Sequence, residues 1–429
     1  MKKIIQLKLK ILAKLILARY KPQVVGITGS LGKTSAKEAI GLVLSKNFRV
    51  RESIKNYNNE FGLPLTIIGS ASAGHSLLGW FKIMFKVWCL LVFKDKNYPE
   101  ILVLEMGIDK PGDMDYLNSI VKPRMAVLTM IGWSHLENFG TQAKLAAEKK
   151  KIFNKLHKGG MAIINFDDEK AREALAEIKH QAITYGILDG ADIQATNLIY
   201  KFQEADAAED LLGINFKIKY KDAYIPVLLP RAISHTAVSA ALAGFAVGVA
   251  YDLNPVEIAQ SLGDFVPPRG RMNLLSGINS SLVIDDTYNA APQSTLAALE
   301  VADQMKLGRT NKKYIVLADM LELGEASEQG HLSVGERVAA MKKTQLLTMG
   351  QEALYIGIGA REHGLAEKDM QHFNNHQEII DYLQDKINAG DLILVKGSQG
   401  MRMEKIVAGI LAEPDKAGEL LVRQGRDWK

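Results

Sequence analysis

Short apolar runs alternate with longer stretches of helical periodicity over most of the 429 residues of this chain. The apolar runs are rich in β-branched residues and predict buried strands, of which the first three are 24–28, 101–105 and 125–130. Stretches with a 3.6-residue period predict helices, which include 36–44, 142–156 and 235–250. Strands that alternate with helices imply a parallel sheet, so the pattern predicts an α/β protein.

A proline- and glycine-rich stretch at 267–271 interrupts this alternation and predicts a domain boundary near residue 268. Beyond it, strands are predicted at 281–285, 313–318, 345–349, 353–357 and 391–396. The helices between them are predicted at 293–306, 330–342, 376–388 and 401–411. We therefore expect a central α/β domain over 21–268 and a second, C-terminal α/β domain over 269–429, with a separate helix over 1–20.

Residues 1–20 and 77–93 are both apolar and basic, and neither stretch contains an acidic residue. The first predicts a basic amphipathic helix. The second lies in an apolar helical insertion over 72–97 and is marginal for a membrane span, because two lysines interrupt it. Packing on the protein and weak, salt-sensitive contact with the inner face of a membrane both remain open. In either case we expect one outward basic surface, formed by Lys3, Lys10, Lys14, Lys82 and Lys86.

Composition narrows the class of protein. The net charge of +5 is too mild to indicate a nucleic-acid partner. Cys89 is the single cysteine, so an internal disulfide is excluded and a reducing cytoplasm is favoured. No secretory signal and no zinc-type cysteine spacing is present. We expect a cytoplasmic monomer.

A glycine loop between the first strand and the first long helix carries the strongest chemical signal. The order of strand, glycine loop, Lys-Thr pair and helix is that of a phosphate-binding loop, with the short Thr-Gly-x-x-Gly-Lys-Thr spacing. Backbone N–H groups and the helix N-terminus would hold the phosphates of ATP, and the Thr hydroxyl would bind Mg²⁺. The alternative is an ordinary turn before a helix. The nucleotide-binding residues predicted here are Gly29, Ser30, Gly32, Lys33, Thr34 and Ser35.

Polar residues also follow the other predicted strands of the central domain. Glu105 ends the second strand, where a carboxylate near the loop is a natural Mg²⁺ ligand, although strand-end acids also cap helices. His135 follows the third strand, and on its own such a histidine is more often structural. Asn58 and Asn59 could grip a polar ligand, but capping of the next helix is the favoured explanation. Lys149 lies in a run of lysines typical of a solvated helix face.

Three predicted strands of the C-terminal domain end in polar residues. Because the carboxyl ends of parallel strands meet at one sheet edge, we expect a substrate site there. The stretches are 285–289, 319–324 and 396–400. The candidate residues within them are Asp285, Asp286, Asn289, Asp319, Glu322, Lys396 and Ser398.

Taken together, these stretches resemble the Mur ligase family. The matching motifs, in the family's order, are 26–34, 58–64, 104–107, 135–140, 270–271, 285–290, 319–324 and 396–398. The resemblance covers about 22–411 and implies a P-loop ATPase-like central domain and a Rossmann-like C-terminal ligase domain. It is closest to members that add D-alanyl-D-alanine to a UDP-linked muramoyl peptide in peptidoglycan synthesis. The implied partners are a small-molecule cell-wall precursor and an amino acid or dipeptide.

The resemblance also implies roles for individual residues. ATP would phosphorylate a substrate carboxylate, and an amine would attack the acyl phosphate to form an amide. Lys33 and Thr34 would together hold the phosphates and one Mg²⁺, with Glu105 beside them. His135 would bind a second Mg²⁺. Lys149 matches the lysine that family members carbamylate, which makes it an anionic metal ligand. Arg271 matches an arginine that contacts phosphate. The family's nucleotide contacts match Asn289 and either Asp285 or Asp286. The residues that would face the substrates are Asn58, Asn59, Asp319, Glu322, Lys396 and Ser398.

Several positions depart from the family pattern. The family usually has a UDP-binding domain ahead of the P-loop, where this chain has only some twenty residues. Thr236 and Ser239 replace two asparagines that help to seat the nucleotide, and Ala291 and Gln399 replace an Asn and an Arg. Two alternatives to the main hypothesis therefore stay open: a ligase for a non-UDP, for example lipid-linked, acceptor, and a nucleotide-binding scaffold without turnover.

Overall fold

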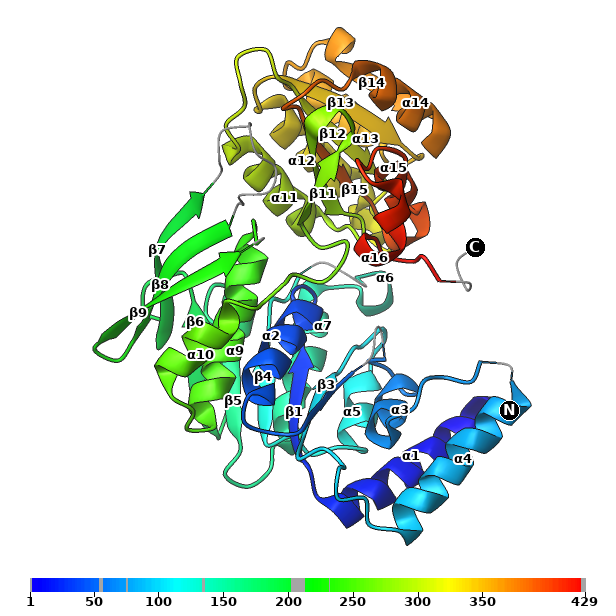
Figure 1. The fold of residues 1–429 in the computed structure, drawn as a ribbon, viewed down its shortest axis with the longest axis vertical. Helices are drawn as coiled ribbons and strands as arrows, with labels where there is room; N and C mark the ends of the chain where they lie inside the picture. The colour runs from blue at the N-terminus through cyan, green and yellow to red at the C-terminus, as the bar shows by residue number, and fades with distance from the viewer. Residues whose placement is uncertain are drawn as a thin grey trace.

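Two α/β halves, each built on one sheet, make up the molecule (Figure 1). The computed structural model describes residues 2–53, 57–74, 76–132, 136–201, 213–230 and 232–425. The first sheet has nine strands in the order β2-β3-β1-β4-β5-β6-β7-β8-β9. The second has six, in the order β10-β11-β15-β12-β13-β14. The prediction of a mixed α/β fold with two sheets is confirmed.

The first sheet is parallel from β2 to β7 and antiparallel from β7 to β9. Its strands are β1 (Gln23–Thr28), β2 (Val50–Glu52), β3 (Ile101–Glu105), β4 (Met125–Leu128), β5 (Met161–Asn165), β6 (Gln181–Gly186), β7 (Ile193–Lys201), β8 (Gly213–Tyr220) and β9 (Ala223–Pro230). The expectation of continued strand–helix alternation was wrong for 193–230. In β9 every second side chain is buried, which is the two-residue period of a half-buried antiparallel strand.

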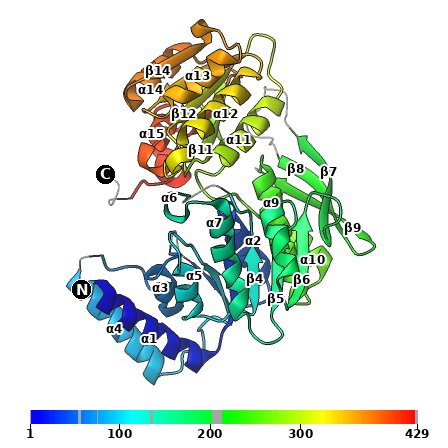
Figure 2. The same ribbon diagram turned by 180° about the vertical axis from the view of Figure 1, so that it is seen from behind.

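Helices cover both faces of this sheet, and the two faces have separate cores. One face packs on α2 (Lys33–Ser45), α9 (His235–Ala250) and α10 (Pro255–Leu262). The other face packs on α1 (Lys2–Tyr20), α3 (Gly62–Ile68), α4 (Leu77–Val92), α5 (Asp113–Asn118), α6 (Leu136–Phe139), α7 (Gln142–Lys150) and α8 (Glu169–Arg172). Figure 2 shows this second group of helices from behind. Buried β-branched side chains between the layers hold the sheet in place.

The second sheet lies between α11 (Pro292–Gln304), α12 (Ser327–Ala339) and α13 (Leu354–Glu362) on one side and α14 (His376–Lys386) and α15 (Glu404–Gly409) on the other. A last short helix is α16 (Ala417–Leu420). The strands are β10 (Asn273–Gly277), β11 (Ser281–Asp286), β12 (Lys313–Ala318), β13 (Thr344–Met349), β14 (Met370–Phe373) and β15 (Leu392–Lys396). All pair in parallel except β10, which pairs antiparallel with β11.

The predicted strand at 353–357 was wrong, because this segment begins α13. Ile356 and Ala360 are buried, whereas Leu354 is largely exposed. Buried positions four residues apart follow the helical period, not that of a strand. The strand that pairs with β13 is β14, which the sequence pattern did not predict.

The two apolar–basic segments form α1 and α4, which lie side by side against the core. The prediction that they pack on the protein is confirmed. The predicted outward basic surface is wrong for Lys10, whereas Lys14, Lys82 and Lys86 are exposed. Lys10 turns inward, donates to the Ser119 hydroxyl and lies 4.7 Å from the centre of the Tyr116 ring. Lys86 donates to the Gly69 carbonyl. The side chain of Lys3 lies outside the described residues. No helix among the described residues is long and apolar enough to cross a membrane.

Candidate active site

The phosphate-binding loop joins β1 to α2, and its glycines are required by the geometry. Gly29 has φ 150°, and a Cβ there would lie 1.9 Å from Thr129 Oγ1. Gly32 has φ 84° and occupies the N-cap of α2, where no side chain accepts from the helix. The first N–H groups of α2 are therefore left for a ligand, as an anion site requires.

Two lysines point at one carbonyl of this loop. Lys33 Nζ donates to Gly29 O at 2.7 Å and to Ser30 O at 3.2 Å, and Lys149 Nζ donates to Gly29 O at 3.0 Å. Burial lowers the pKa of Lys33; Glu105 raises it and Arg271 lowers it. Burial lowers the pKa of Lys149 well below its usual range, and the neighbouring Lys33 lowers it further. Two amines and the Arg271 guanidinium thus lie around the loop where phosphates would bind.

Glu105 lies at the carboxyl end of β3, directly opposite Ile27 of β1. Its side chain is buried, and Oε1 has no hydrogen-bond donor among the described residues. Lys37, one helical turn after Lys33, approaches this atom at 3.9 Å. A buried carboxylate oxygen without a donor, next to the P-loop, fits a hard cation such as Mg²⁺. Thr34 and Glu105 would hold that ion.

The described residues include no group of three or more His, Cys, Asp or Glu side chains that could hold a metal ion. A Mg²⁺ site here therefore needs further oxygen ligands. A carbamate on Lys149 would supply them. The depressed pKa of Lys149 favours the neutral amine, which is the form that reacts with carbon dioxide. The predicted ligand His135 lies outside the described residues.

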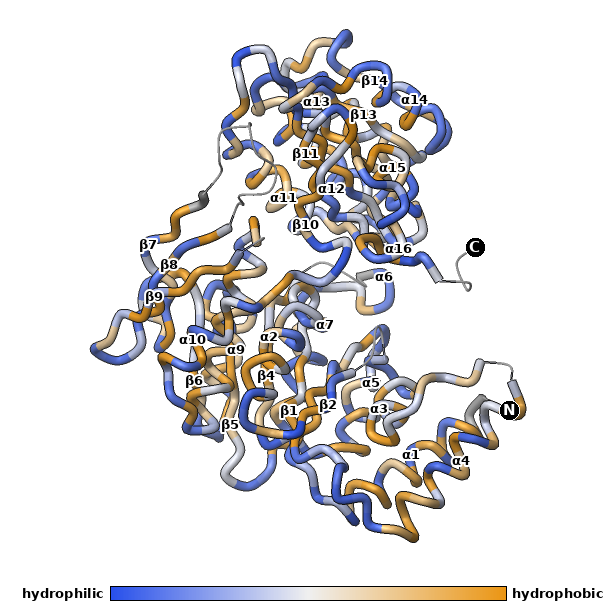
Figure 3. The backbone as a smooth tube through the Cα atoms, in the orientation of Figure 1, coloured by the Kyte–Doolittle hydropathy of each residue, from blue (hydrophilic) through white to orange (hydrophobic). Residues whose placement is uncertain are grey.

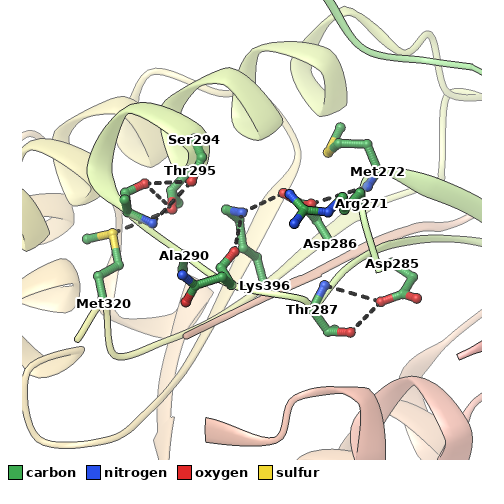
Figure 4. Close-up of polar contacts among 12 residues, drawn as sticks. Arg271, Met272, Asp285, Asp286, Thr287, Ala290, Ser294, Thr295, Met320 and Lys396 are labelled. Carbon is green, nitrogen blue, oxygen red and sulfur yellow. Dashed lines mark hydrogen bonds and ion pairs between the residues drawn. The ribbon is translucent and has the colours of Figure 1, made fainter. Parts of the chain in front are cut away.

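The three polar strand ends of the second sheet lie together, because β11, β15 and β12 are consecutive neighbours. Lys396 Nζ donates to Asp286 Oδ2 at 2.6 Å and to the Asn289 carbonyl at 2.9 Å, and both charged side chains are buried (Figure 4). The Asn289 side chain accepts from the Gln399 N–H at 3.2 Å. This edge is therefore internally paired before any substrate binds.

Asp285 is fully buried beside this pair. Its Oδ1 accepts from the Thr287 hydroxyl at 2.6 Å and the Thr287 N–H at 3.2 Å, whereas Oδ2 has no partner among the described residues. Burial raises the pKa of Asp285 to about 6. Asp286 Oδ1 accepts from the Met272 N–H at 3.2 Å, so Asp286 links β11 to the chain segment that carries Arg271.

The remaining predicted substrate residues hold local structure. Asp319 Oδ1 accepts from the Ala353 N–H at 2.8 Å, just before α13. Ser398 Oγ accepts from the Leu321 N–H at 2.8 Å. Glu322 lies in this turn with φ 65°. Asn59 Oδ1 accepts from two N–H groups at the start of α3, which supports the capping explanation over ligand binding. The Asn58 side chain packs against Gly107, two residues beyond Glu105.

Arg271 links the two halves of the molecule. Its guanidinium lies 4.0 Å from the centre of the Tyr288 ring and donates to Thr34 Oγ1 at 3.3 Å. The Gln293 side chain also lies close to Gly132, so a second contact links the C-terminal half to the end of the central sheet. The structure thus brings the P-loop, Glu105, Lys149 and Arg271 into one site.

Two groups near this site were not predicted from the sequence. His331 is buried on α12; its Nε2 accepts from the Met320 N–H at 2.9 Å, which fixes the 319–324 turn. Glu404 pairs with Arg402 at 2.6 Å and Arg423 at 2.7 Å, and Arg423 donates to the Tyr288 carbonyl at 3.0 Å. The signal for His331 was a polar residue on the buried stripe of a helix. No local signal connects Arg423 with the chain just after β11, more than a hundred residues earlier.

Comparison with known proteins identifies the family. The model of the Mur ligase middle domain matches residues 88–227, and that of the Mur ligase glutamate ligase domain matches 270–399. The UDP-N-acetylmuramoyl-tripeptide–D-alanyl-D-alanine ligase of Bacillus subtilis is 31% identical over 406 residues, which are 94% of this chain and 79% of that protein. The chain belongs to the Mur ligase family.

Solved Mur ligases share its architecture. The MurF ligase of Thermotoga maritima in complex with ADP superposes with a TM-score of 0.77 at 26% identity, covering 96% of this chain and 84% of that one. The Escherichia coli enzyme named for the same tripeptide and dipeptide is 28% identical over 395 residues, 90% of this chain and 76% of that protein. The two matched Mur ligase domains include Glu105, Lys149, Arg271 and the three polar strand ends of the second sheet.

Proposed function

We propose that this protein is an ATP-dependent ligase that joins D-alanyl-D-alanine to the peptide carboxylate of UDP-N-acetylmuramoyl-tripeptide, with release of ADP and phosphate. One observation carries the proposal: Lys33 and Lys149 donate to the same P-loop carbonyl, and Arg271 reaches Thr34 from the other half of the molecule. The buried, donor-free Glu105 oxygen lies on the strand next to β1, which leads into this loop. The names of the Mur ligase relatives supply the substrates. We place the reaction in the cytoplasm and expect a monomer.

The residues have distinct roles in this mechanism. The substrate carboxylate attacks the γ-phosphorus of ATP, which forms an acyl phosphate and releases ADP. Lys33 and the N–H groups of α2 stabilise the negative charge that develops on the phosphoryl oxygens. Arg271, which reaches across from the second sheet, orients the same group. When bound, Mg²⁺ neutralises phosphate charge, held by Thr34, Glu105 and a carbamylated Lys149, with His135 as the proposed ligand of a second ion.

The second half-reaction forms the amide. The amine of the dipeptide attacks the acyl carbon, and the tetrahedral intermediate expels phosphate together with the former carboxylate oxygen. We assign substrate positioning to the paired edge of the second sheet, where Lys396 and Asp286 fix the backbone around Asn289. Asp319 and Ser398 hold the neighbouring turns, and Asn58 and Glu322 remain proposed contacts. The site supplies mainly position and charge, because this chemistry needs little covalent participation from the protein.

Phosphate release tests the proposal. Purified protein with ATP, Mg²⁺, the UDP-linked tripeptide and D-alanyl-D-alanine should release phosphate, and omission of either acceptor or dipeptide should abolish the release. An acceptor panel with and without the uridine moiety separates this function from a ligase for lipid-linked acceptors. ATP binding without turnover on every acceptor would contradict the ligase proposal and favour a scaffold.

A further inference from the structure

The α1–α4 pair, defined as α1 together with α4, exposes large apolar side chains on its outer side. The six that matter most are Leu7 and Ile11 on α1 and Leu78, Phe81, Phe85 and Trp88 on α4, here called the apolar patch. All six are at least 49% exposed, and Leu78 is 77% exposed. Figure 3 shows the apolar colouring along both helices. So many large exposed apolar side chains on two adjacent helices are unusual in a free monomer and indicate a binding surface.

The patch is not an incomplete part of the core. The inner side of each helix has its own buried stripe, formed by Leu9, Ala13 and Ile16 on α1 and by Ile83, Val87 and Leu90 on α4. The Tyr20 hydroxyl at the end of α1 donates to the Leu90 carbonyl at 2.9 Å and accepts from the Asp95 N–H at 3.0 Å. The two helices are therefore fixed in place with their apolar outer side turned to solvent.

Charge indicates what covers the patch. Lys8, Lys14 and Lys82 are exposed beside it, and neither helix contains an Asp or Glu. A second copy of the chain is a poor partner, because a two-fold contact would bring these lysines together with no carboxylate between them. An anionic bilayer surface suits both features, since its headgroups attract lysine and its acyl boundary accepts Leu, Phe and Trp.

We propose that the α1–α4 pair is an interfacial anchor that lies on an anionic lipid bilayer, with the apolar patch inserted at the headgroup–acyl boundary. In Figures 1 and 2 the pair lies on the end of the central half that is remote from the second sheet. Binding there leaves the active site open to its substrates. Because apolar insertion contributes as well as charge, high salt should weaken this binding without abolishing it.

Vesicle co-sedimentation of the full chain tests the anchor. Vesicles of phosphatidylcholine with added phosphatidylglycerol are compared with pure phosphatidylcholine at low and high salt. The test variant is Leu78→Ser/Phe81→Ser/Phe85→Ser. Its matched control is Tyr224→Ser/Leu228→Ser/Val256→Ser, which removes three exposed apolar side chains from β9 and α10. We expect anionic vesicles to bind wild type and control, and the test variant to lose at least about tenfold in partitioning.

Charge and insertion are tested separately. Lys8→Gln/Lys14→Gln/Lys82→Gln should reduce the preference for anionic vesicles, whereas Lys217→Gln/Lys342→Gln/Lys405→Gln, on exposed sites elsewhere, should not. The emission of Trp88 should shift to the blue on vesicle binding, and Trp88→Phe should remove that shift.

The proposal is overturned if wild type does not co-sediment with anionic vesicles, or if test and control variants bind equally. A wild-type dimer in light scattering that the patch substitutions dissociate, without vesicle binding, would assign the surface to a second copy instead.

Discussion

The carboxyl edges of the two sheets carry opposite kinds of charge arrangement. At the first, Lys33 and Lys149 both donate to the Gly29 carbonyl, and the Glu105 oxygen nearby has no donor among the described residues. At the second, Lys396 and Asp286 form a buried ion pair with further hydrogen bonds on both partners. Lys37 approaches the Glu105 oxygen only to 3.9 Å, so a bound anion and cation would complete the charges of the first edge. By contrast, Lys396 and Asp286 at the second edge already complete each other. We propose that the first edge performs the phosphate chemistry and that the second fixes the geometry.

Breaking the paired edge should have the largest effect on stability. Lys396→Met leaves Asp286 buried and unpaired, which should lower the free energy of unfolding by about 3–5 kcal/mol. The double variant Asp286→Asn/Lys396→Met removes both charges and should recover most of this loss. Urea unfolding monitored by circular dichroism measures both. A single variant as stable as wild type would show that the pair does not hold this edge.

Removing the Lys33 charge at the edge of the first sheet should lower turnover and not stability. Lys33→Ala should lower kcat by about 10²–10³-fold, about 3–4 kcal/mol in activation free energy, because the lost charge acts on phosphoryl oxygens in the transition state. The free energy of unfolding should change little, because removal of Lys33 also relieves its repulsion with Lys149 and Arg271. Lys405→Ala, at an exposed position on α15, is the matched control. Retention of more than a tenth of the wild-type kcat would refute the role of Lys33.

Asp285 provides a pH test of the second edge. Its pKa is raised from 3.8 to about 6 in the folded protein, so between about pH 4 and pH 6 the folded state binds more protons than the unfolded state. The stabilisation from protonated Asp285 is therefore present below pH 4 and lost as the pH rises to 6. Relative to wild type, Asp285→Asn should gain about 2–3 kcal/mol across this window. Asp222→Asn, at an exposed turn, should show no such gain, and parallel pH profiles for Asp285→Asn and wild type would contradict burial of the carboxylate.

Substitution of Lys149 should have the smallest effect, and it distinguishes a carbamylated metal ligand from a purely structural lysine. Lys149→Ala should lower kcat by about 10–100-fold through loss of a metal ligand, and added bicarbonate or short carboxylic acids should restore part of it if a carbamate is the ligand. The neighbouring exposed Lys155→Ala serves as control. A carbamate carbon signal in ¹³C NMR with labelled bicarbonate should appear in wild type and be missing from Lys149→Ala. Equal activity of Lys149→Ala and wild type would return Lys149 to a purely structural role.

Much of the site could be predicted because it depends on where strands end. The P-loop, Glu105 and the polar ends of β11, β12 and β15 are local sequence signals, and the sheet order brings them together. The run of lysines at 149–151 resembles a solvated face, yet Lys149 is buried. Only the family resemblance singled it out, since its partner is the Gly29 carbonyl, 120 residues earlier in the chain.

Other features could not be predicted, because they depend on which face of an element meets its neighbours. Lys10 shares one side of its helix with other lysines, but its side chain turns toward Tyr116 and Ser119. These are contacts with another part of the chain, which helical periodicity alone does not predict. The segment 353–357 is apolar enough for a strand or a helix. It forms the start of a helix, α13, because its buried side packs against α12. The domain boundary near residue 268 and the individual roles of the site residues stay predictions.

Isotope transfer is the most direct measurement of the central claim. The peptide carboxylate of the UDP-linked tripeptide is labelled with ¹⁸O, and the phosphate released in the complete reaction is analysed by mass spectrometry. If the carboxylate is activated as an acyl phosphate and the amine attacks carbon, one labelled oxygen must appear in each phosphate, and one amide product must form for each ADP. Unlabelled phosphate, released whether or not the dipeptide is present, would mean that water attacks ATP and would contradict the ligase account.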